Sequence, residues 1–113
     1  SQLSTDATQF YITYGGTSAQ TPIPVGKEIG SPTSRSSAFY ELIIYAPSTV
    51  VDTFYVKVTN ITTGVTFEQT LTGNATQIPV NTVLLAPKAW KTNNATASSV
   101  AFDIASIYIE TDN

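Results

Sequence analysis

The stretch 51-VDTFYVKVTNITTGVTFEQTLTG-73 decides the fold, because its two halves predict a β-hairpin. Two runs rich in β-branched and aromatic residues flank the short segment "NITTG", whose final glycine favours a turn. In the first run Phe54, Val56 and Val58 alternate with other residues and therefore share one face. The corresponding face of the second run holds Phe67, Gln69 and Leu71, together with Val65. This stretch predicts two antiparallel strands.

Three segments before the hairpin also have extended character. Residues 8–14, "TQFYITY", alternate with a period of two and predict a strand. Residues 21–32 contain three prolines, which restricts them to an edge segment and a loop. Residues 39–46, "FYELIIYA", are apolar almost throughout. Because a half-exposed strand shows one polar face, this run predicts a strand that is covered on both faces.

The C-terminal third continues the pattern. Residues 76–90 contain two prolines and predict one or two short strands, and a last strand is predicted from Ser99 to Glu110. Both faces of this last strand are largely apolar, which predicts cover from its own domain on one side and from a second sheet or subunit on the other. No window shows a sustained helical period. The sequence therefore predicts an all-β, antiparallel β-sandwich of jelly-roll type over residues 8–113, preceded by a tail or linker remnant at residues 1–7.

Composition excludes several classes of function. The chain of 113 residues is long enough for one domain with its own core, and it contains no cysteine, histidine or methionine. Disulfides, thiolate metal sites and histidine catalysis are therefore excluded. Five basic against eight acidic residues give a net charge of −3, which argues against a nucleic-acid surface. We see no apolar run long enough to cross a bilayer, and the first ten residues do not have the features of a signal peptide.

Two of the eight carboxylates are the main candidates for catalysis. Glu41 and Asp103 each interrupt an apolar strand, so they could form the acid and base of a small glycosidase. The alternative is a structural role, in which each carboxylate is satisfied by a cation such as Arg35 or by backbone donors. A domain of this size rarely encloses a cleft, so we predict the structural role and no enzyme activity. The sequence contains no calcium-loop motif, and we predict no metal and no cofactor.

Aromatic side chains are the candidates for binding. Tyr11 and Tyr55 lie on strand faces opposite the predicted core residues, so both are expected at the surface. Trp90 is either a core anchor or a stacking platform, and the turn that follows it contains Asn93 and Asn94. Aromatic faces together with amide and hydroxyl groups suit neutral sugars, and they equally suit protein interfaces.

Long stretches of the sequence resemble the C-terminal β-sandwich of bacteriophage tail fibres and tailspikes. The resemblance is carried by "GSPTSRSSAFYELIIYAP", by "FYVKVTNITTGVTFEQTL" and by the ending "LLAPKAWKTNNATASSVAFDIASIYIETDN". It implies a homotrimeric receptor-binding tip that closes the fibre and binds a polysaccharide of the bacterial surface. It also implies a location on the virion, in the phage tail, acting outside the host cell.

A trimer gives the last strand a physical role, because a terminal fibre domain buries its edges against sister chains. Small residues on one face of this strand let another backbone approach closely. We therefore predict that this face forms the trimer interface. Its members are Ala101, Asp103, Ala105, Ile107 and Ile109. Two alternatives remain open: a purely structural trimerisation module with recognition or depolymerase activity in a preceding domain, and a monomeric carbohydrate-binding module of a secreted bacterial enzyme.

Overall fold

The computed structural model describes residues 6, 8–31, 38–47, 49–50, 52–79 and 104–109. The chain divides into two compact units, Ser1–Val83 and Leu84–Asn113. The division falls inside the segment 8–113, whose extent as one domain stays a prediction. Because the first unit contains every strand of the described residues, the account of the fold concerns that unit.

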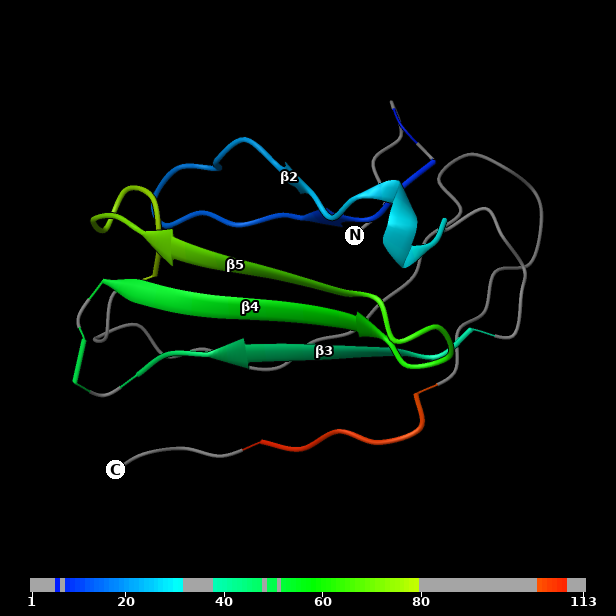
Figure 1. Cartoon of the computed structure of the whole chain (residues 1–113). Coiled ribbons are helices and arrows are strands. Elements are labelled where there is room, and N and C mark those ends of the chain that lie inside the picture. The colour runs from blue at the N-terminus through cyan, green and yellow to red at the C-terminus, as the bar shows by residue number, and fades with distance from the viewer. Residues whose placement is uncertain are drawn as a thin grey trace. The chain divides into compact units, whose positions relative to one another are not determined.

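The described part of the chain is all-β, as predicted, with two antiparallel sheets (Figure 1). The smaller sheet pairs β1 (Tyr11–Ile12) with β2 (Ile23–Pro24). The larger sheet has the order β3 (Tyr40–Tyr45), β4 (Thr53–Asn60) and β5 (Thr66–Thr72). The described residues contain no α-helix, and their one helical turn is the 3-10 helix η1 (Lys27–Ile29). Within the predicted edge segment and loop, residues 21–24 lead into and form β2, while η1 was not predicted.

The hairpin of β4 and β5 confirms the opening prediction. Its register places Phe54 opposite Leu71, Val56 opposite Gln69 and Val58 opposite Phe67. These residues therefore share one face, which we call the inner face. Two hydrophobic clusters lie against it: one joins Val25, Ile29 and Val58, and the other joins Val56, Leu71 and Ile78. Ile12 of β1 packs against both clusters, so the smaller sheet is held to the larger one by apolar burial.

A buried amide organises the turn between β4 and β5. The side chain of Asn60 donates from Nδ2 to the carbonyl oxygen of Ile29 at 2.7 Å, and its Oδ1 accepts from the backbone N–H groups of Thr62 and Thr63. Gly64 closes the turn at a φ of 81°, in the left-handed region that glycine adopts without steric cost. Both polar side-chain atoms of the buried Asn60 thus have hydrogen-bond partners, and together they join this turn to η1.

Strand β3 differs from the prediction, which expected cover on both faces. All six of its residues are exposed. Leu42 and Ile44 stand opposite Val58 and Val56 and so belong to the inner face, yet they are 60% and 64% exposed. The two clusters lie over β4 and β5, and among the strands that the structure describes β3 is at the edge of the sheet. An apolar run identifies a strand, but it does not identify the element that covers it.

The predicted C-terminal strands fall largely outside the described residues. Residues 80–103 and 110–113 are not described, while residues 77–79 follow β5 in a turn and a bend. Within the predicted strand from Ser99 to Glu110, the described residues 104–109 carry no strand and are all exposed. The strand prediction is therefore wrong for these six residues in the single chain.

Candidate functional site

The outer face of the larger sheet is the face turned away from the two clusters. Strand alternation gives it every second residue of each strand. The register arranges these residues in three rows that cross all three strands, and the pair Thr53–Thr72 of β4 and β5 lies beyond them. The rows are Tyr45–Tyr55–Thr70, Ile43–Lys57–Glu68 and Glu41–Thr59–Thr66. The face thus combines aromatic, charged and hydroxyl-bearing side chains within a few rows.

The first two rows form a groove of about 580 Å³. Its side chains from the outer face are Ile43, Tyr45, Tyr55, Lys57, Glu68 and Thr70. The groove lies on a sheet surface with apolar and polar groups side by side. We call it the outer-face groove.

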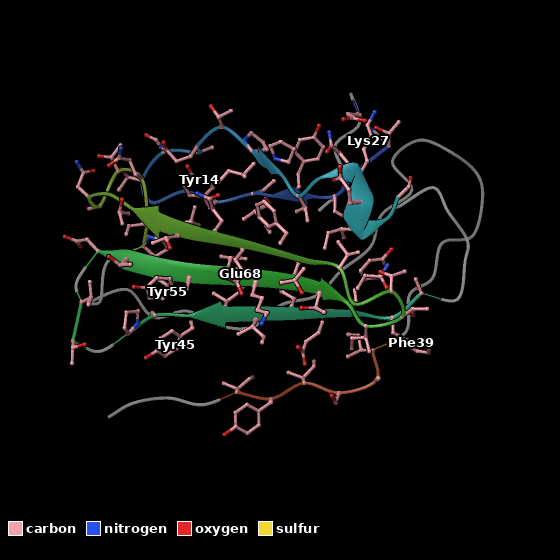
Figure 2. The ribbon with its side chains drawn as sticks, viewed as in Figure 1. Tyr14, Lys27, Phe39, Tyr45, Tyr55 and Glu68 are labelled. Carbon is pink, nitrogen blue, oxygen red and sulfur yellow. The ribbon has the colours of Figure 1, made fainter. Side chains whose placement is uncertain are left out.

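Two tyrosines form the aromatic part of this groove. Tyr45 and Tyr55 are directly paired across β3 and β4, and their rings stack with centroids 6.0 Å apart and an angle of 17° between planes. Tyr55 is 40% exposed, as its strand position predicted. Among the described residues neither phenol hydroxyl has a hydrogen-bond partner, so both can bond to a ligand or to water. Figure 2 shows the two side chains at the same end of the sheet, with Glu68 further along it.

An ion pair forms the polar part of the groove. Lys57 and Glu68 stand directly opposite each other on β4 and β5, with Nζ 3.6 Å from Oε1. The two side chains are 45% and 69% exposed, so water reaches both charged groups. The groove therefore carries one positive and one negative charge in close proximity. Its described lining residues carry no excess of either sign that would select a charged ligand.

Tyr11 belongs to a different part of the first unit. It lies on β1, and its hydroxyl donates to Oδ2 of Asp6 at 2.5 Å and accepts from Nε2 of Gln9 at 3.2 Å. Tyr11 precedes Ile12, which packs against the clusters, so the two side chains leave β1 on opposite sides. The structure does not bring Tyr11 together with Tyr55, and the two residues cannot line one groove.

The carboxylate of Asp6 is a hub of hydrogen bonds. Its Oδ1 accepts from the hydroxyl of Thr8 at 2.6 Å and from the backbone N–H of Thr8 at 2.9 Å, and its Oδ2 accepts from Tyr11 and Gln9. Hydrogen bonds to its charged form hold the pKa of Asp6 far below its usual range. The largest effect comes from the side chain of Thr8, and the next largest from that of Tyr11. The hydrogen bond to Asp6 raises the pKa of the Tyr11 phenol, with desolvation adding to the effect. This network fixes the chain that leads into β1.

The remaining predicted binding residues lie outside the described residues or are exposed. Trp90, Asn93 and Asn94 are not described, so their predicted role stays a prediction. Of the predicted interface, Ala101 and Asp103 are also not described. Ala105, Ile107 and Ile109 are exposed in the single chain. Their place in a trimer interface stays a prediction as well.

Glu41 is exposed to solvent, and this exposure explains how an otherwise apolar strand can contain a carboxylate. It is an exposed residue of β3, on the outer face opposite Thr59. We expected a partner for this carboxylate because its strand was predicted to be covered. Since water can solvate an exposed carboxylate, Glu41 needs no protein partner. Its predicted companion, Asp103, is not described.

Sequence reasoning missed Tyr45 and the ion pair of Lys57 and Glu68 as parts of a site. The signal was present in the hairpin. With Asn60 at the end of β4 next to the turn, the hairpin register pairs Lys57 with Glu68. The antiparallel pairing of β3 with β4 then places Tyr45 beside Tyr55. These neighbours become apparent only when the register is followed across all three strands.

No protein-family model, no curated protein and no solved structure matches the chain. The described residues contain no group of acidic side chains able to hold a metal ion. Within the same residues no helix is long and apolar enough to cross a membrane.

Proposed function

We propose that this chain is a non-enzymatic tip domain of a phage tail fibre or tailspike, which binds a host-surface saccharide in the outer-face groove. The observation that carries the proposal is the stacked pair of Tyr45 and Tyr55 on an exposed sheet face. A tyrosine ring offers an apolar face to the C–H side of a sugar and a hydroxyl to its edge. Thr70 lies directly opposite Tyr55 and adds a second hydroxyl beside the ring.

A binding role fits this groove better than catalysis does. Glycoside hydrolysis commonly needs a pair of carboxyl groups, one on each side of the scissile bond. Among the described residues that line the groove, the one carboxylate is that of Glu68, and it already faces the ammonium group of Lys57. Glu41 lies on the same face but does not line the groove.

The proposed architecture is a trimeric β-sandwich of jelly-roll type on the virion, acting outside the host cell. Two antiparallel sheets joined by apolar clusters support the sandwich. Exposed apolar side chains in the single chain, among them Ile107 and Ile109, support burial against other copies. Three grooves on one trimer would bind a polysaccharide with avidity, even where one site binds weakly.

The same exposed side chains favour a second candidate, a purely structural trimerisation module. That module would form the trimer but would not bind sugar. Binding of saccharide by the full chain separates the two functions.

The test is calorimetric titration of the full chain with bacterial surface polysaccharides. We expect Tyr55→Ala to weaken binding by about tenfold, the effect of removing one anchoring aromatic side chain worth roughly 1–2 kcal/mol. Tyr55→Phe keeps the ring and should retain most of the affinity. Equal affinities of wild type and Tyr55→Ala would remove this groove from the function. Absence of binding by a wild-type trimer would favour the structural module.

A further inference from the structure

We infer that the ion pair of Lys57 and Glu68 recognises two adjacent hydroxyl groups of a sugar, so that the outer-face groove selects neutral saccharides over those that carry uronate groups. This inference rests on the proposed function and specifies the class of saccharide. It depends on three features of the pair. The pair contributes little to the stability of the fold, it lies beside Tyr55, and its two charges are opposite and equal.

The pair has a large unused capacity for hydrogen bonds. Its N–O separation of 3.6 Å exceeds the range of about 2.7–3.2 Å for a good hydrogen bond. An ammonium group offers three donors, and a carboxylate offers about four acceptor positions. An exposed pair of this kind contributes little to folding, because water screens it. Lys57 and Glu68 can therefore bond to a ligand without loss of a strong internal contact.

The register places the pair where the edge of a stacked sugar lies. Lys57 follows Tyr55 by two residues on the same face of β4, a distance of roughly 7 Å along an extended strand. Glu68 stands opposite Lys57 on β5. A sugar ring on Tyr55 thus extends its hydroxyl groups towards both charged atoms. Adjacent ring hydroxyls stand about one hydrogen-bond length apart, so one can donate to Glu68 while its neighbour accepts from Lys57.

The balance of charge sets the selectivity. A neutral diol uses both members of the pair, since each hydroxyl is a donor and an acceptor. A uronate carboxylate is attracted to Lys57 and repelled by the nearby Glu68, so the two effects largely cancel. The uronate must also lose water when it enters the groove. Neutral sugars are therefore expected to bind more tightly.

The experiment compares matched probes on the full chain. The neutral probes are glucan, mannan and galactan, and the charged probes are the same polymers oxidised at C6 to uronates. For a polymer that binds, we expect wild type to prefer the neutral form by about tenfold, the effect of one charge-assisted hydrogen bond. Glu68→Gln removes the repulsion and should abolish or reverse this preference. Lys57→Met should weaken binding of both forms.

Glu41→Gln is the matched control, because it removes one carboxylate from the same face outside the groove. It should keep the wild-type preference. If Glu68→Gln and Glu41→Gln show the same preference, the inference is wrong while the groove can still be the site. If Tyr55→Ala also binds like wild type, the proposed function fails with it. If wild type binds no probe and no bacterial surface polysaccharide, both fail.

Discussion

Asn60 shows how one side chain can join two parts of the fold. Its amide is buried, donates to the carbonyl oxygen of Ile29 and accepts from two N–H groups of the turn. A buried polar group that loses its partner costs more than an exposed one, because water cannot replace the bond. The link between η1 and the hairpin therefore depends on this residue.

We expect Asn60→Ala to lower the free energy of unfolding by about 1–3 kcal/mol, since the carbonyl of Ile29 loses its partner in the interior. Asn74→Ala is the matched control. Asn74 accepts from the N–H of Thr76 in a similar turn, but it is exposed, so the loss should stay below about 1 kcal/mol. Urea unfolding measures both values. Similar losses for the two variants would contradict the role of burial.

The hydrogen bonds of Asp6 predict a dependence of stability on pH. The pKa of Asp6 in the folded chain lies below its ordinary value of 3.8, so folding favours the ionised carboxylate. This contribution is complete above about pH 5 and is lost as the pH falls below 3.8 towards the lower pKa of the folded chain. Tyr11 has a raised pKa, so its contribution is complete below 10.0 and is lost at higher pH.

The measurement is the acid unfolding of wild type and of Tyr11→Phe, with the carboxyl carbon of Asp6 followed by NMR. Removing the phenol hydroxyl should raise the pKa of Asp6 and should make the acid loss of stability smaller. The hydrogen bonds from Thr8 should still hold this pKa below 3.8. An unchanged titration of Asp6 in Tyr11→Phe would show that the bond between these residues is not formed in solution.

At the scale of elements, the hairpin was predictable and the environment of β3 was not. Alternation from Phe54 to Leu71 determines which residues share a face, and Gly64 marks the turn, because both signals are local. The exposure of Leu42 depends on which segments pack over β3, and that information is not local. The groove shows the same limit. Tyr55 was predicted at the surface from its own strand, whereas Tyr45 joins it through pairing between strands.

Leu71 and Leu42 provide a matched test of this description. Both lie on the inner face of the same sheet, but Leu71 is 7% exposed and Leu42 is 60% exposed. We expect Leu71→Ala to lower the free energy of unfolding by about 2–5 kcal/mol, and Leu42→Ala to lower it by about 0.5 kcal/mol or less. Thermal unfolding at low protein concentration measures the difference. A large loss for Leu42→Ala would show that β3 is covered in solution.

At the scale of the whole molecule, the proposed trimer explains why a chain with few charges exposes large apolar side chains. Ile107 and Ile109 are 66% and 59% exposed in the single chain. Burial of these side chains against other copies would remove them from water, and that driving force is not screened by salt. An assembly formed in this way should therefore persist at high ionic strength. It should also be sensitive to a charge placed at the contact.

The most direct test of a trimeric tip domain is the mass of the full chain by multi-angle light scattering, at low salt and in molar sodium chloride. We predict about 36 kDa at both salt concentrations, three times the 12.1 kDa of one chain. Ile107→Asp should reduce this mass, because each copy would bring a carboxylate into an apolar contact. A trimer that is unaffected by Ile107→Asp would remove residues 104–109 from the interface. A wild-type mass of 12.1 kDa at micromolar concentration would contradict the trimer and favour a monomeric carbohydrate-binding module.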